Sequence, residues 1–141
     1  MKKTLLAVIA FVGISGLLFS GQIQITNFKD LRNALDEGKV VSVKVKIDHA
    51  KKHIKEIGYH IVHFMYDGEN IHTSRKIVIT KNGNHEILIA FITFKPDGTA
   101  IADVTIIDPK TGEETSQPPH KGKINNGDSK DTGNVYLYTV E

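Results

Sequence analysis

Histidine is the residue type in this sequence most suited to chemistry, because the chain has seven histidines and no cysteine. His49 and His53 lie four residues apart, which on a helix places both imidazoles on one face, the spacing that zinc sites use. A third ligand would have to come from elsewhere, and Asp48, His72 or His85 could supply it. We therefore name His49 and His53 as candidate metal ligands; the alternative is that the histidines are half-exposed polar residues of loops and strands.

The remaining catalytic patterns point to no enzyme. His60 and His63 are three residues apart, so on a strand they would face opposite ways and only one could join a shared site. Four serines lie outside the Gly-x-Ser-x-Gly elbow typical of hydrolases: Ser42, Ser74, Ser116 and Ser129. Asp97 and Asp103 could form a carboxylate pair for glycoside hydrolysis, but a turn already explains Asp97. The sequence predicts a protein that is not an enzyme and has no cofactor.

Aromatic and large apolar residues suggest a binding surface instead. The predicted strand 59–66 would carry them on both faces, with Tyr59, Ile61 and Met65 on one and Val62, Phe64 and Tyr66 on the other. Tyr136 and Tyr138 would share a face near the C-terminus. An open, curled sheet lined in this way could bind an apolar ligand or a peptide. The alternative is that these residues form the sheet core, which is built from such side chains.

The first residues have the layout of a secretory signal peptide. Lys2 and Lys3 precede an apolar run from Leu5 to Phe19 that contains no charge, and small residues follow. We expect residues 1–21 to be removed, with cleavage near Ser20 or Gly21, and the protein to be periplasmic or secreted without a membrane anchor. The alternative is an uncleaved anchor, although the run is shorter than the roughly 20 residues of a spanning helix. Because no cysteine follows the run, a lipoprotein is excluded.

Removal of that segment changes the charge balance. The chain has 18 basic and 16 acidic residues, and Lys2 and Lys3 would leave with the signal peptide, so that 16 of each remain. A neutral domain gives no support for nucleic-acid binding. The remaining residues, 22–141, are numerous enough to bury a core without disulfides, and we expect one domain.

A short helix is predicted after Asn27. Phe28, Leu31 and Leu35, together with Ala34, form an apolar stripe at helical spacing. Asn27 is a suitable N-cap, because its side chain can accept a hydrogen bond from the first turn. Gly38 suits the left-handed residue that ends a helix.

The pattern after the helix is that of strands joined by tight turns. Alternation or apolar runs predict strands at 41–47, 59–66, 71–80, 86–94, 100–107 and 135–140. The run 86–94 is apolar on both faces, so we expect it at the centre of the sheet. Asn82-Gly83 predicts a hairpin, because both residues tolerate positive φ. Pro96-Asp97-Gly98 predicts a turn.

The stretch from Gly112 to Asn134 is polar and has no period, so we expect a loop at about 112–134, either a binding arm or a passive tether. Short connections favour antiparallel neighbours. The predicted fold is α+β: one N-terminal helix packed on a curled, antiparallel five- to six-stranded meander sheet.

The order of these parts resembles the VirK family of small exported bacterial proteins. The resemblance lies in the pattern Phe28-x-x-Leu31-x-x-Ala34-Leu35-x-x-Gly38-Lys39-Val40, in the strands around Gly58-Tyr59, and in the turn Lys95-Pro96-Asp97-Gly98-Thr99. It covers roughly Phe28 to Ile107. Relatives are expected to carry a cysteine near the end of the first strand, where this chain has Ile47-Asp48-His49-Ala50. The resemblance implies an exported, virulence-associated protein and supplies no catalytic residues.

The sequence thus predicts a non-enzymatic exported protein that binds a protein partner in the envelope or outside the cell. We expect a monomer. The alternative is an exported module that binds a small ligand or a metal ion, with His49 and His53 as the residues to test.

Overall fold

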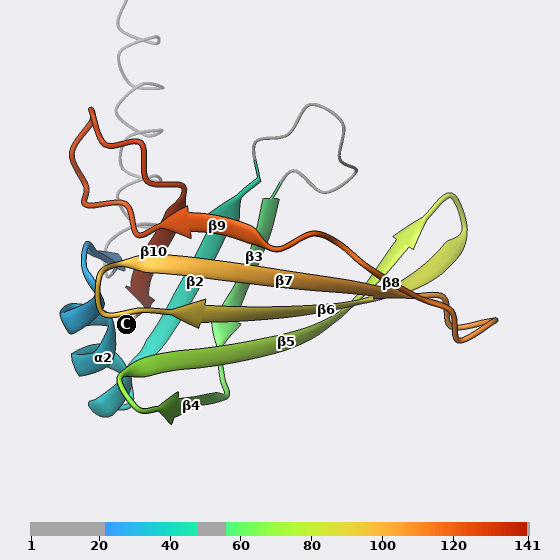
Figure 1. The fold of residues 1–141 in the computed structure, drawn as a ribbon, viewed down its shortest axis with the longest axis horizontal. Helices are drawn as coiled ribbons and strands as arrows, with labels where there is room; N and C mark the ends of the chain where they lie inside the picture. Colours follow the sequence, from blue (N-terminus) through green and yellow to red (C-terminus); the bar gives the residue numbers. More distant parts are fainter. Residues whose placement is uncertain (1–21, 48–55, 141) are drawn as a thin grey trace, which may run out of the picture.

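The computed structural model describes residues 22–47 and 56–140, with the backbone alone at Lys81. The elements are β1 (Gln22–Ile25), α2 (Phe28–Asp36), β2 (Val40–Lys46), β3 (Glu56–Ile61), β4 (Phe64–Asp67), β5 (Asn70–Lys81), β6 (Asn84–Phe94), β7 (Thr99–Ile107), β8 (Glu114–Ser116), β9 (His120–Lys123) and β10 (Val135–Val140). The strands form two antiparallel sheets that cross at a steep angle (Figure 1). Among the residues described, no helix is long and apolar enough to cross a membrane.

Helix α2 forms as its sequence predicts. The Asn27 side chain accepts a hydrogen bond of 2.9 Å from the Asp30 backbone N–H, which satisfies one free donor of the first turn. The four residues of the apolar stripe are all buried: Phe28, Leu31, Ala34 and Leu35. Gly38 follows the helix with a φ of 72°, a left-handed conformation that glycine adopts without a steric cost.

The four-stranded sheet has the order β1-β10-β2-β3. The last strand of the chain therefore lies between the first two, and Leu137 of β10 is opposite Ile25 of β1 on one side and Val43 of β2 on the other. Inward-facing residues of β2, β3 and β10 alternate with more exposed ones, as expected for a sheet with one face on the core. Strand β3 is at the edge of this sheet.

The six-stranded sheet has the order β4-β5-β6-β7-β8, and β9 also pairs with β7. Strand β6 lies in its interior, which confirms the central position predicted for 86–94. The β5–β6 hairpin turns at Asn82 and Gly83, which both have positive φ (52° and 76°), as its sequence predicts. Strands β5 and β6 are the longest of the fold, and their hairpin end extends beyond the four-stranded sheet (Figure 1).

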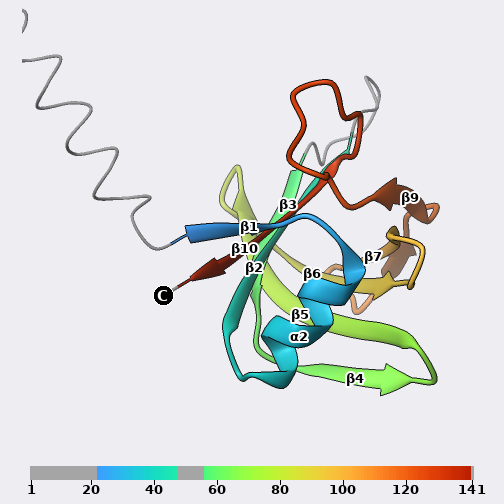
Figure 2. The same cartoon turned by 90° about the vertical axis from the view of Figure 1, so that its left-hand side faces the viewer.

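The inner faces of both sheets and the apolar stripe of α2 share one hydrophobic core. Figure 2 shows α2 at one end of the two crossing sheets. Phe94, Leu31 and Ile71 are among the largest fully buried side chains and come from β6, α2 and β5. A buried hydrogen bond also joins the sheets, because Tyr59 Oη on β3 lies 2.7 Å from Thr73 Oγ1 on β5.

The structure corrects the predicted architecture in part. The α+β class, the N-terminal helix and the antiparallel pairing are confirmed, but the strands form two sheets rather than one meander of five or six strands. The predicted strand 59–66 is wrong as a single element: it contains the end of β3 and the start of β4, which belong to different sheets. Strand β1 was not predicted.

The polar stretch 112–134 is also more ordered than its sequence predicts, since it contains β8 and β9. Its last part is held by side-chain amides. The Asn134 amide accepts from the Lys123 N–H of β9 and donates to the Lys46 carbonyl of β2, at 3.1 and 2.9 Å. The buried Asn125 amide donates to the Gly133 carbonyl. This stretch therefore links the two sheets, and whether it is also a binding arm stays a prediction.

Candidate binding surface

Four large apolar side chains are exposed around the start of β4. The exposed fractions are 59% for Val62, 39% for Phe64, 59% for Met65 and 38% for Tyr66. We call these residues the Phe64 patch. Exposed apolar residues that occur singly are ordinary, but several in one short segment are the usual mark of a contact surface.

The patch is exposed because of where β4 lies. Strand β4 is four residues long and at the edge of the six-stranded sheet. Phe64 and Tyr66 pair with Thr73 and Ile71, two fully buried residues of the inner face, so they point towards the same side of the sheet. They remain half-exposed there, while the rings of Phe64 and Tyr66 contact one another edge to face at 5.6 Å between centroids.

Helix α2 fixes one end of the patch. The Tyr66 hydroxyl donates a hydrogen bond to Asp36, and the Arg32 guanidinium lies over the Tyr66 ring, 4.7 Å from its centroid. Arg32 Nε is in turn 4.0 Å from Asp36 Oδ2. Partial burial and the neighbouring Asp36 carboxylate raise the pKa of Tyr66 to about 12. The phenol therefore stays protonated at neutral pH and serves as a donor, not as a base.

The composition of this surface suits contact with another protein. Tyrosine, phenylalanine and arginine are enriched at the centres of protein interfaces. Tyr66 and Phe64 share the inner side of β4 with Arg32 beside them, whereas Met65 points to the outer side. The aromatic rings are held in place before any partner arrives, which reduces the entropy lost on binding. The aromatic residues are visible in the sequence, but the contact of Arg32 is not, because it depends on how α2 meets β4.

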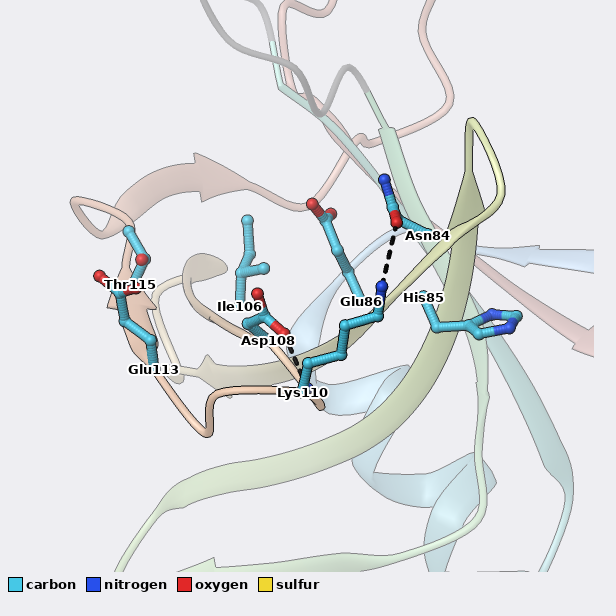
Figure 3. A pocket seen from close by; sticks show the side chains of 8 residues that line it. All are labelled: Asn84, His85, Glu86, Ile106, Asp108, Lys110, Glu113 and Thr115. Carbon is cyan, nitrogen blue, oxygen red and sulfur yellow. Dashed lines mark hydrogen bonds between the residues drawn. The ribbon is translucent and has the colours of Figure 1, made fainter.

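A separate pocket of about 410 Å³ lies at the far end of the six-stranded sheet (Figure 3). Lys110 reaches across it towards Asn84, with 3.5 Å between Nζ and Oδ1. Of the acids that line the pocket, Asp108 is used by its own turn, where it accepts from the Lys110 and Thr111 backbone N–H groups. The His85 ring points away from Lys110 and contacts Thr80 Oγ1 at 3.0 Å. This pocket pairs no base with a nucleophile.

The histidine hypotheses receive no support. His49 and His53 lie outside the described residues, so their proposed role stays a prediction. Within 22–47 and 56–140, no group of three or more histidine, aspartate or glutamate side chains is placed to hold a metal ion. His60 lies on β3, while His63 lies between β3 and β4. His72 and His85, nominated as third ligands, each contact a threonine.

His72 has contacts like those of a catalytic histidine, which the sequence did not indicate. His72 Nδ1 is 2.9 Å from Thr93 Oγ1, and its Nε2 is 3.6 Å from Asp67 Oδ2. A hydroxyl, an imidazole and a carboxylate in this order are the groups of a catalytic triad. However, β6 is paired on both sides, so the sheet ladders use the backbone N–H groups around Thr93 that an oxyanion hole would need. We interpret the contacts as bracing of the sheet's outer face.

Asp97 and Tyr59, singled out from the sequence, have structural roles, and Asp103 is not paired with Asp97 in a turn or a hydrogen bond that the structure shows. Asp97 accepts a 2.8 Å hydrogen bond from the Thr99 N–H, and this bond lowers the pKa of its carboxyl group, so the turn explains it as predicted. Asp103 lies on β7 opposite Phe91. Tyr59 is part of the core and separate from the exposed aromatics, because β3 ends before Val62.

The arrangement of a capped helix against two crossed antiparallel sheets is similar to that of a solved VirK family protein. It matches the crystal structure of a VirK family protein from Legionella pneumophila with a TM-score of 0.66, over 82% of this chain and 98% of that chain. The two sequences are 12% identical, so the likeness concerns the fold. No protein-family model matches the sequence, and no curated protein matches it. The resemblance predicted from the sequence is confirmed at the level of the fold.

Proposed function

We propose that this chain is an exported, VirK-like protein that binds a protein partner in the bacterial envelope or outside the cell and performs no chemistry itself. The observation that carries the proposal is the Phe64 patch, where the half-exposed rings of Phe64 and Tyr66 lie on one side of β4 with Arg32 over Tyr66, and Val62 and Met65 are exposed in the same segment. The resemblance to the VirK family adds a virulence-associated role to this proposal.

Export is supported by the layout of the first 21 residues. Strand β1 begins at Gln22 and pairs along its whole length with β10, so a cleavage near Ser20 or Gly21 would leave the sheet intact. Cleavage a few residues later would remove β1 from the fold. The intact mass of the protein recovered from the periplasm and medium of an expressing bacterium tests this step, with a start near Gln22 expected and the full-length mass in the cytoplasm contradicting it.

The partner-binding step is tested by exchanging apolar residues for alanine at two matched surfaces. Phe64→Ala with Tyr66→Ala removes the two aromatic side chains that point towards the inner side of the six-stranded sheet. Val78→Ala with Ile89→Ala removes two exposed apolar side chains from the opposite, outer face of the six-stranded sheet. We expect the first pair to reduce capture of the partner from envelope extract or host lysate by about tenfold or more, as for truncated interface anchors, and the second pair to leave it unchanged.

The same experiment can reject the proposal. Equal capture by both double variants and the original protein would show that the patch is not the contact surface. Circular dichroism of each variant shows whether the fold is retained. A loss of capture that is caused by unfolding is recognised in this way.

A further inference from the structure

A hollow of about 480 Å³ lies on the outer face of the four-stranded sheet, centred on Gly58 of β3. Ser42 and Lys44 of β2 line one side, and Arg75 and Ile77 of β5 close it where the two sheets come together. It shares no residue with the Phe64 patch, and its role is independent of the function proposed above.

Residue 58, which lines the hollow, is a glycine inside a strand. A glycine inside a strand weakens the strand, and it often marks a place where a ligand or another backbone approaches closely. Within the described residues, nothing in the fold requires glycine here: its φ lies outside the left-handed region, and an added Cβ would come no closer than 3.6 Å, to the Val43 carbonyl oxygen. Among the described residues, the glycine leaves the space above β3 on this side of the sheet open.

The charges around the hollow are unbalanced. Lys44 Nζ is 3.0 Å from Glu56 Oε1, so these two charges compensate one another. The Arg75 guanidinium has no carboxylate within ion-pair distance among residues 22–47 and 56–140. Among the residues described, the hollow thus holds one uncompensated positive charge beside the apolar side chain of Ile77.

From this geometry we propose that the Gly58 hollow binds a carboxylate group attached to a short apolar body. The planar guanidinium of Arg75 can donate two parallel hydrogen bonds to the two carboxylate oxygens. The apolar body would lie over Gly58 against Ile77. The carboxylate can come from a free small acid or from an acidic side chain of a polypeptide, and the two sources differ in what is attached to it.

Titration of the purified protein with hexanoate, followed by the backbone amide signals of β2, β3 and β5, tests the site. We expect saturable shifts centred on Gly58. Arg75→Gln removes the charge at similar size, and Gly58→Val fills the hollow with a residue that strands favour. Each should weaken hexanoate binding by about tenfold or more, the loss typical of a charged hydrogen bond. Lys76→Gln, which removes a neighbouring charge from the opposite face of β5, should leave binding unchanged.

A parallel titration with the capped peptide acetyl-Ala-Glu-Ala-amide distinguishes the sources. Tighter binding of the peptide assigns the hollow to a partner's acidic residue, and tighter binding of hexanoate assigns it to a free acid. The proposal is overturned if neither probe gives saturable shifts, or if Arg75→Gln binds as well as the original protein. Because Arg75 is exposed, its exchange keeps the test valid even if Gly58→Val does not fold.

Discussion

Tyr59 of β3 and Thr73 of β5 form a buried hydrogen bond of 2.7 Å between the two sheets of this protein. Both side chains are inside the core, so neither hydroxyl can turn to water if its partner is lost. Tyr59→Phe should reduce the free energy of unfolding by about 1–2 kcal/mol, because it leaves the Thr73 hydroxyl buried without a partner. Urea unfolding measures the change.

The matched changes for this bond are Thr73→Val and Tyr138→Phe. The double variant Tyr59→Phe with Thr73→Val should lose less free energy of unfolding than the sum of the two single changes. The reason is that Thr73→Val removes the hydroxyl that Tyr59→Phe leaves unpaired. Tyr138, on β10, makes no hydrogen bond with its hydroxyl among the residues described, so Tyr138→Phe should be close to neutral. Strict additivity of the two core changes would contradict the bond.

Stability at alkaline pH should depend on the same tyrosine. Burial raises the pKa of Tyr59 to about 12, against about 10 in the unfolded chain, while the bond to Thr73 acts weakly in the other direction. The native state therefore holds the phenol proton more tightly. Its contribution is complete below pH 10 and is lost as the pH rises through about 12, amounting to about 2–3 kcal/mol. Between these pH values, the free energy of unfolding should fall less steeply with pH for Tyr59→Phe than for the original protein. Identical slopes would disprove the assignment.

Gly133→Ala should destabilise the protein through a backbone clash. A Cβ at this position would lie 2.8 Å from Asn125 Cα and 3.0 Å from the Ile124 carbonyl oxygen, which are backbone atoms that cannot turn away. We expect a loss of about 1–3 kcal/mol, the usual cost of overpacking. Gly58→Ala is the matched control: its Cβ has room at 3.6 Å, and stability should stay equal or rise slightly. Thermal unfolding of both variants checks the contrast.

The N-cap of α2 gives a local test of the helix. Asn27→Ala removes the side-chain acceptor of the Asp30 N–H and should cost about 1 kcal/mol. Asn27→Ser keeps an acceptor and should recover most of that loss. If both variants unfold at the same denaturant concentration, the cap does not contribute to stability.

Local signals in the sequence predicted local structure well. The stripe of Phe28, Leu31 and Leu35, the Asn82-Gly83 hairpin and the alternation of β2 each depend on neighbours only a few residues away, and each is found in the structure. The division into two sheets could not be predicted in this way. The break occurs at Val62-His63, two residues with no turn signal, and the partners of each strand lie far away in the chain.

The candidate surfaces show the same limit. The apolar residues Phe64, Met65 and Tyr66 are visible in the sequence, but their exposure depends on β4 being a short edge strand. The Gly58 hollow depends on Arg75, which is close to β3 only because β5 crosses the edge of the other sheet. A period of two assigns a face to a side chain and does not show what lies opposite that face.

The position of β10 sets the order in which this protein can be assembled. Strand β1 has β10 as its hydrogen-bonded neighbour in the sheet, and Gln22 pairs with Val140, so the first strand has to wait for the last one to be synthesised. Until Val135–Val140 are present, one edge of β2 also lacks its hydrogen-bonded neighbour. The four-stranded sheet therefore closes only once β10 is in place between β1 and β2.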